Sequence, residues 1–268
     1  MNLSNTNIAT SISVVFGFLL LLLLPFDKAL IFFELDDFKE KYLGDAIKNL
    51  VIVCYGYFLI QRFGYTKVSG VFNFAPRHKK LIIIPLYFVL IGPLQYALFD
   101  YEFDHVQLIN VLILLGAMIT VGLSEEIIFR GFVLPNLIRG TSSDQSLVGP
   151  IVLSSLLFGV LHFLNLLNAD SYFPLVLSQV IYATMFGVAF GVILLRTGSL
   201  LPLGLLHGLI NFSSNWDDLP GTFEPAIVET YRMHDAIFSV IIVLPFFLYA
   251  LKQLPKIDRK AVLSMYKD

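Results

Sequence analysis

The chain has 268 residues, of which 57% are hydrophobic and only 14% charged, and its mean hydropathy is +0.78. Soluble domains usually carry roughly a quarter charged residues, so the composition argues against a soluble enzyme. The net charge of −2 gives no electrostatic reason to bind nucleic acid, and we expect no such partner. The single cysteine, Cys54, excludes an internal disulfide and a paired-cysteine metal site, and we expect it to be a small buried packing residue.

Apolar runs long enough to cross a bilayer follow one another along the whole chain. A helix needs about 17 to 25 apolar residues to cross a hydrocarbon core of roughly 30 Å, and by this criterion the sequence predicts about eight spans. They cover residues 8–26, 46–61, 81–99, 106–123, 147–167, 174–195, 200–212 and 236–254, of which 200–212 is the shortest. The first is interpreted as a retained helix, because no Lys or Arg precedes it and no small-residue cleavage site follows. We therefore expect an all-α, polytopic membrane protein with a single transmembrane domain over residues 1–268.

The distribution of charge between the spans predicts the orientation of the chain. Basic residues follow the second and the last span, and they are Arg62, Lys67, Arg77, Lys79, Lys80, Lys252, Lys256, Arg259, Lys260 and Lys267. Cytoplasmic loops carry an excess of Lys and Arg, so these segments and both termini are predicted to be cytoplasmic. Connections rich in Asp and Glu, at residues 100–104 and 217–229, fit the opposite side.

The clearest chemical signal is a charged cluster at the end of the fourth span. Ionisable groups at membrane depth cost a few kcal/mol or more unless they are paired or face a polar cavity. At about 100° per residue Glu125 and Glu126 diverge, whereas Glu126 and Arg130, at i and i+4, share a face and can form an ion pair. This leaves Glu125 for chemistry. In the alternative interpretation, the cluster is a helix end at the water interface with Arg130 reaching the headgroups.

Two other spans carry polar residues that a bilayer disfavours. His162 lies in the fifth span one turn after Phe158, where a lone histidine is more often a hydrogen-bonded packing residue than a catalyst. In the seventh span His207 is followed at i+4 by Asn211, so both side chains point from one face. Because Glu125, both histidines and this asparagine occupy three apolar spans that must provide partners for them, we expect the four to converge.

Small and amide residues complete the predicted packing. Pairs of glycines at a spacing of four on the sixth and seventh spans predict close helix contacts, and they are Gly187, Gly191, Gly204 and Gly208. Gln95 and Gln179 are expected to hydrogen-bond between helices rather than to line a cavity.

The residues permit two chemistries. A carboxylate held near imidazoles in a low-dielectric cavity can act as a general base on water, which predicts a hydrolase. His207 and Asn211 then offer donors to an oxyanion that develops on an attacked carbonyl, and His162 can orient the water. Alternatively, Glu125, His162 and His207 are three ligands that leave an open position on a catalytic zinc ion.

Three motifs occur complete and in order: EExxxR at residues 125–130, FxxxH at 158–162 and HxxxN at 207–211. With them the chain resembles, over about residues 106–212, the CPBP superfamily of intramembrane proteases, the type II CAAX prenyl endopeptidase and bacteriocin-processing and immunity family. The resemblance implies an intramembrane endopeptidase whose helices enclose a catalytic cavity. Glu125 matches the glutamate that activates water, His162 the histidine associated with it, and His207 with Asn211 the oxyanion-stabilising pair. Glu126, Arg130 and Phe158 take supporting positions.

The resemblance also carries expectations about cofactor and substrate. It favours metal-free hydrolysis without a cofactor over hydrolysis at a zinc ion. The implied substrate is a membrane-associated peptide or protein that is cut near one end, and prenylated CAAX proteins are one such class. The resemblance also implies that substrates enter the site from the cytoplasmic side. The continuation Arg130–Phe132 is similar to the prokaryotic branch, which implies a prokaryotic plasma membrane. Two rival hypotheses stay open: a non-catalytic scaffold or immunity protein with this fold, and a transporter with a Glu/His relay, against which the absence of detectable inverted repeats argues.

Overall fold

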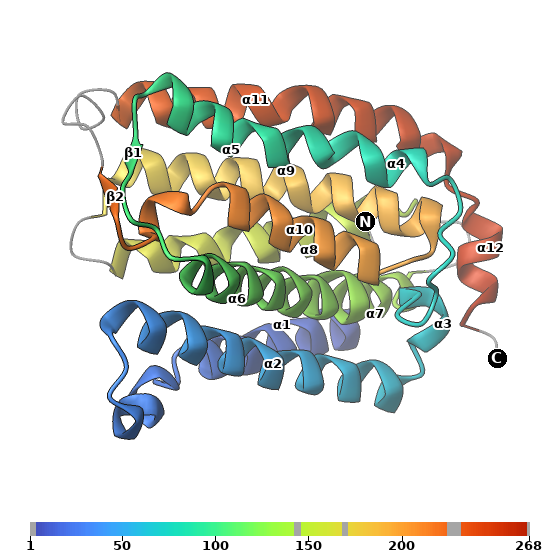
Figure 1. The fold of residues 1–268 in the computed structure, drawn as a ribbon. Coiled ribbons are helices and arrows are strands. Elements are labelled where there is room, and N and C mark those ends of the chain that lie inside the picture. Colours follow the sequence, from blue (N-terminus) through green and yellow to red (C-terminus); the bar gives the residue numbers. More distant parts are fainter. Residues whose placement is uncertain (1–3, 142–145, 168–170, 224–231, 267–268) are drawn as a thin grey trace.

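The computed structural model describes residues 4–141, 146–167, 171–223 and 232–266, and they form a bundle of helices lying side by side (Figure 1). The α-helices are α1 (Asn5–Leu22), α2 (Asp37–Phe63), α3 (Thr66–Ser69), α4 (Lys80–Ile83), α5 (Tyr87–Leu98), α6 (Leu108–Glu126), α7 (Leu134–Arg139), α8 (Val148–Val160), α9 (Phe173–Thr197), α10 (Leu201–Ser213), α11 (Arg232–Gln253) and α12 (Arg259–Ser264). Tighter 3₁₀ segments are η1 (Asp27–Phe33), η2 (Ile84–Leu86), η4 (Leu161–Leu167), η5 (Trp216–Asp218) and η7 (Leu254–Lys256), and η3 (Ile127–Val133) is a wider π-helix. Two short antiparallel strands, β1 (Glu102–Phe103) and β2 (Thr222–Phe223), pair with Glu102 opposite Phe223.

Local signals set the ends of the long helices. The Asp36 side chain accepts a hydrogen bond of 2.9 Å from the Lys39 backbone N–H and so caps the start of α2. α2 and α9 each end at a glycine with positive φ, Gly64 at 73° and Gly198 at 66°, a conformation that costs other residues energy. Proline occupies the first turn of α9 and α10, where its missing N–H has no helical partner.

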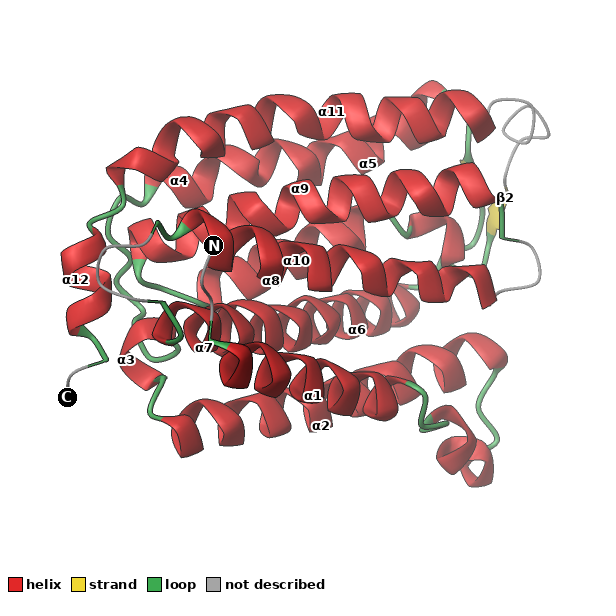
Figure 2. Ribbon diagram, turned by 180° about the vertical axis from the view of Figure 1, so that it is seen from behind, coloured by secondary structure: helices red, strands yellow, loops and turns green. Residues whose placement is uncertain are grey.

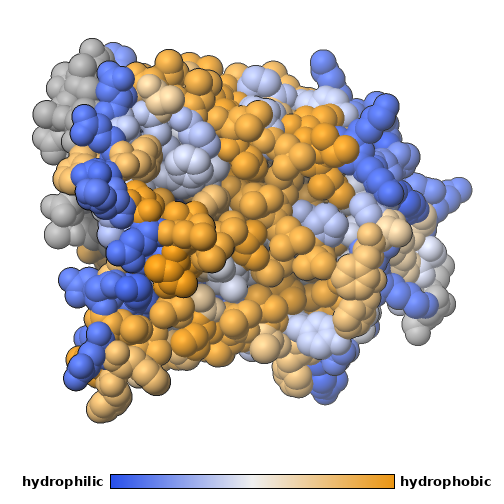
Figure 3. Space-filling view, viewed as in Figure 1, coloured by the Kyte–Doolittle hydropathy of each residue, from blue (hydrophilic) through white to orange (hydrophobic). Residues whose placement is uncertain are grey.

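The membrane-spanning character of the bundle follows from length and surface. Among the described residues, seven helical segments are long and apolar enough to cross a bilayer, and α10, with 13 residues, is shorter. Figure 3 shows a broad hydrophobic band between two ends where hydrophilic side chains gather. The chain is therefore a multi-pass integral membrane protein, as predicted. Cys54 is exposed on the surface of the bundle, so the expectation that it is a buried packing residue is wrong.

The two ends of the bundle differ in charge. One end, named the basic end, contains the start of α1 and the helices α3 and α12. The basic residues described at this end are Arg62, Lys67, Arg77, Lys79, Lys80, Arg139, Arg196, Lys252, Lys256, Arg259 and Lys260. The other, named the acidic end, carries β1, β2, η1 and η5, and α11 begins there at Arg232. Its charged residues are Asp27, Glu34, Asp36, Asp37, Glu40, Asp45, Asp100, Glu102, Asp104, Asp217, Asp218 and Asp235 beside Lys28, Lys39, Lys41 and Lys48. The first and last described residues lie at the basic end, where the Ser4 N–H donates to the Gly140 carbonyl and the Tyr266 hydroxyl to the Pro135 carbonyl. The start of α1 and the helix α12 lie on this side in Figure 2. Its assignment to the cytoplasm stays a prediction.

Glycines bring the helices of the central layer into close contact. A Cβ atom built on Gly122 of α6 would lie 2.3 Å from the backbone N of Gly208 on α10, and one built on Gly187 of α9 would lie 2.7 Å from the Ser155 Cβ of α8. The predicted close packing at Gly187 and Gly208 is thus confirmed. It fixes α10 against α6 and α9 against α8, and the polar motifs begin on α6, α8 and α10.

The fourth span continues beyond its predicted end. The sequence places that end near Leu123, but α6 passes directly into η3 and α7 and the helical segment reaches Arg139. Every side chain from Glu126 to Ile138 is buried. The charged motif resembled a helix terminus, but its charges are paired inside the bundle, so the helix can go on.

Candidate active site

The second glutamate of the EExxxR motif forms a sealed polar cluster. Glu126 Oε1 lies 2.9 Å from Arg130 Nη1 and 3.0 Å from His207 Nδ1, and the Glu126 and Arg130 side chains are each 1% exposed. The predicted i, i+4 ion pair is therefore confirmed. The alternative of an interfacial helix end is wrong, because Arg130 does not reach the surface of the bundle.

Aromatic rings surround the buried guanidinium. The Arg130 Cζ lies 4.5 Å from the ring centroid of Phe158 and 5.9 Å from that of Phe190. Ring faces attract cations, and this attraction offsets part of the cost of taking the charge out of water. Phe158 thus helps to hold Arg130, which in turn holds Glu126 beneath His207.

Glu125 points to a different environment from its neighbour. Its side chain is 20% exposed and lines a cavity, and its Oε2 lies 3.4 Å from Nε2 of His207. The two carboxylates therefore face opposite ring nitrogens of one imidazole. Nδ1 of His207 donates to Glu126, while Nε2 faces Glu125 and the cavity.

His162 lies at the start of the segment in which α8 tightens, just after Leu161. It is the second residue of η4, and its Nδ1 lies 3.3 Å from the Phe158 carbonyl oxygen. The Phe158 ring contacts both imidazoles edge-on, with centroids 5.1 Å from His162 and 6.0 Å from His207. Tight and wide helical turns are common at functional sites, and here η4 and η3 adjoin the two motifs that flank the cavity.

Two cavities meet at the predicted residues. One, of about 300 Å³, is bounded by α1, α6, α8 and α10 and includes Glu125; the other, of about 360 Å³, is bounded by α5, α8, α9, α10 and α11. His162, His207 and Asn211 line both. Within the described part of the chain, the Asn211 side-chain amide has no hydrogen-bond partner, so its N–H groups are available to a ligand. The structure thus brings Glu125, His162, His207 and Asn211 to one place.

The zinc alternative does not fit the observed geometry. Among residues 4–141, 146–167, 171–223 and 232–266, no three His, Cys, Asp or Glu side chains are placed to hold a metal ion together. Glu125, His162 and His207 therefore do not form the three-ligand set that the sequence permits. His207 in particular directs both ring nitrogens toward carboxylates.

Sequence reasoning missed the amide residues of the cavity. Asn165, Gln179 and Asn215 line the smaller cavity, the one that includes Glu125. The Asn165 amide donates a hydrogen bond of 2.7 Å to Gln179 Oε1. Gln95 lines the larger cavity. The expectation that the two glutamines bond between helices rather than line a cavity is wrong for Gln95, and Gln179 does both. Their polarity at the edge of apolar runs is the signal that could have revealed them.

A comparison with protein families connects this geometry to a known class. The family model for the type II CAAX prenyl endopeptidase Rce1-like proteins matches residues 107–213, which contain all three motifs. No curated protein and no solved structure matches the chain. The match confirms the predicted resemblance and supports, at the level of the family, a CAAX-type intramembrane protease.

Proposed function

We propose that this protein is an intramembrane endopeptidase in which Glu125 activates the attacking water. The observation that carries the proposal is the contrast between the two adjacent glutamates: Glu125 reaches the cavity, whereas Glu126 is sealed against Arg130. A general base must reach its substrate water, and of the two carboxylates Glu125 is the one that does.

The arrangement supports a complete hydrolytic sequence. Glu125 takes a proton from a water molecule held between it and His162, and the water oxygen attacks the carbonyl carbon of the scissile peptide bond. The oxyanion accepts a hydrogen bond from the Asn211 amide and, when both His207 nitrogens are protonated, from Nε2–H. Glu125 then passes its proton to the leaving nitrogen as the C–N bond breaks, which restores the carboxylate.

The substrate is a membrane-associated peptide or protein that is cut near one end, and prenylated CAAX-type proteins are one candidate class. The membrane is a prokaryotic plasma membrane. Polar groups of an extended substrate backbone need partners at this depth, and the amides that line the cavity offer them. Glu126, Arg130 and Phe158 do not contact substrate in this proposal but position His207 and His162.

The test compares new protein termini in membranes from cells that express the wild type or Glu125→Gln at equal abundance, read by terminal-peptide mass spectrometry. Glu102→Gln, which neutralises an exposed glutamate on β1 outside the site, is the matched control. We expect termini that appear with the wild type and the control and vanish with Glu125→Gln. Identical termini in all three samples would contradict the proposal and favour a non-catalytic scaffold or a transporter.

A further inference from the structure

Asn165 and Gln179 form a pair of carboxamides beside the proposed catalytic residues. The Asn165 amide of η4 donates a hydrogen bond of 2.7 Å to Gln179 Oε1 of α9, and both side chains line the smaller cavity together with Glu125. A carboxamide has two N–H donors and a carbonyl acceptor, so one mutual bond leaves the pair with further hydrogen-bonding groups. Within the described part of the chain no other residue takes them. The pair therefore offers the cavity an acceptor, Asn165 Oδ1, and donors on Gln179 Nε2.

The tight helical segment η4 aligns Asn165 with His162. In a 3₁₀ helix residues three apart lie on the same face, and Asn165 is three residues after His162. At a rise of about 2 Å per residue, the two positions are about 6 Å apart along the helix axis. An extended peptide advances about 3.3 Å per residue, so this distance corresponds to about two residues of a bound substrate.

Gln179 lies where the two cavities meet. It lines both of them, as His162 and Asn211 do, so a peptide chain that runs from one cavity into the other passes it. Asn215 also lines both, but its Nδ2 donates a hydrogen bond of 2.6 Å to the backbone carbonyl of Asn211 on the same helix. The pair of Asn165 and Gln179 is instead formed between two helical segments and faces the space between them.

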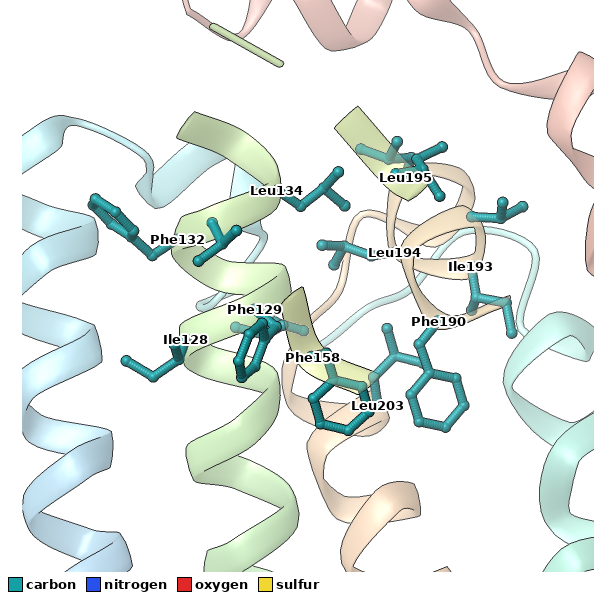
Figure 4. Close-up of a cluster of buried hydrophobic side chains, with 14 of the residues drawn as sticks. Ile128, Phe129, Phe132, Leu134, Phe158, Phe190, Ile193, Leu194, Leu195 and Leu203 are labelled. Atoms are coloured by element: carbon teal, nitrogen blue, oxygen red, sulfur yellow. The ribbon is translucent and has the colours of Figure 1, made fainter. Parts of the chain in front are cut away.

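The other walls of the smaller cavity are largely apolar. Phe129 and Phe158 lie side by side at the edge of the packed core, with ring centroids 5.1 Å apart, and both line this cavity (Figure 4). Phe18 and Leu22 of α1 line it as well. Such side chains offer no partner to the N–H and C=O groups of a peptide, and at membrane depth each unpaired group costs several kcal/mol. The partners must therefore come from the carboxamides.

We propose that Asn165 and Gln179 form a subsite that binds the main chain of the substrate about two residues from the scissile bond. Asn165 Oδ1 accepts a hydrogen bond from a peptide N–H, and Gln179 Nε2 donates one to a peptide carbonyl, as the edge of a β-sheet does. Main-chain contacts do not depend on the side chain, so the subsite takes any residue except proline, which lacks the N–H. This inference rests on the proposed protease function and adds two binding residues to it.

Kinetics with modified peptides test the subsite. The probe is a synthetic peptide that spans the most abundant Glu125-dependent terminus. In each member of a set, one peptide N–H outside the scissile bond is replaced by an ester oxygen, which removes the donor without adding bulk. We measure kcat and KM in proteoliposomes for the wild type, for a double variant with Asn165→Leu and Gln179→Met, and for Gln61→Met. The last is the matched control, because Gln61 is an exposed glutamine of α2 outside the site.

We expect the ester at one position, two residues from the cut, to raise KM about tenfold for the wild type and the control, the size expected for one lost hydrogen bond. The kcat should stay unchanged, because the contact binds substrate and transition state equally. The double variant should show the higher KM with the unmodified peptide, and the ester should then add nothing. An equal effect at every position, or an effect that persists in the double variant, would overturn the subsite. Should the double variant fail to fold, the set of esters with the wild type decides alone.

The two proposals fail in different ways. If no Glu125-dependent terminus is found, the protease proposal fails and the subsite fails with it. If the peptide is cut in a Glu125-dependent manner but no single ester changes KM, the protease proposal stands and the subsite is refuted.

Discussion

Replacing Gly122 by alanine tests whether the close approach of α6 and α10 builds the site. The added Cβ would lie 2.3 Å from Gly208 N and 2.6 Å from Gly204 O, whereas ordinary contacts begin at 3.4 Å. Both neighbours are backbone atoms and cannot rotate away, so the helices must separate by about 1 Å. Overpacking of this kind costs about 1 to 3 kcal/mol of stability.

The separation acts directly on the polar cluster, because Glu126 is four residues after Gly122 and His207 immediately precedes Gly208. The contact of 3.0 Å between Glu126 and His207 would lengthen, and Nε2 of His207 would shift relative to Glu125. A displacement of about 1 Å in a catalytic group can lower a rate on the order of 100-fold. We expect Gly122→Ala to lose most cleavage while the protein still folds.

The assay is the rate at which Glu125-dependent termini accumulate, normalised to abundance, together with the thermal unfolding midpoint in detergent. Gly116→Ala is the matched control, because it lies on the same helix and a Cβ there meets nothing within 4 Å. Alanine favours a helix over glycine by up to about 1 kcal/mol, so the control should be at least as stable as the wild type. Equal cleavage and equal midpoints for the two variants would refute the role given to the close approach.

Two further variants probe the groups behind the site. Glu126→Gln should destabilise the protein by about 3 to 5 kcal/mol, because it leaves Arg130 buried without a counter-charge. Adding Arg130→Met to this variant should restore stability but not cleavage. A double variant that is as unstable as Glu126→Gln alone would contradict this explanation. Phe158→Ala should cost about 3 to 5 kcal/mol and slow cleavage, since the ring packs on Arg130 and both imidazoles, while lipid-exposed Phe173→Ala should change little. Thermal unfolding and terminal-peptide yields measure both, and similar losses for the two phenylalanine variants would contradict the packing role.

Much of the fold can be predicted from the sequence, because a bilayer restricts the composition and length of the helices that cross it. Spans must be apolar and long enough to cross the bilayer, so their order follows from hydropathy. Of the eight predicted spans, seven are long enough to cross in the described part of the chain, and α10 is shorter. The ion pair of Glu126 with Arg130 follows from helical periodicity, and the different surroundings of Glu125 and Glu126 follow from that pair. The shared face of His207 and Asn211 is a consequence of the same periodicity.

Other features depend on tertiary contacts that no local pattern contains. The continuation of the fourth span to Arg139 needs partners for the charged motif, and one of them, His207, comes from a helix 81 residues away. The 3₁₀ segment that starts at Leu161, and the shape of the cavities, depend on how α8, α9 and α10 meet. The sequence therefore indicates which residues meet but not the space that they enclose.

The buried cluster is better explained by function than by stability. Glu126 Oε2 and Arg130 Nη2 have no hydrogen-bond partner in the described part of the chain, so the pair recovers less of its desolvation cost than a fully satisfied network would. Apolar residues of similar volume would hold α6, η3 and α10 together at lower cost. What they could not do is accept a hydrogen bond from His207 Nδ1 and so turn Nε2 toward Glu125. The cost of burying this charge pair is thus the cost of orienting one imidazole at the floor of a cavity deep in the membrane.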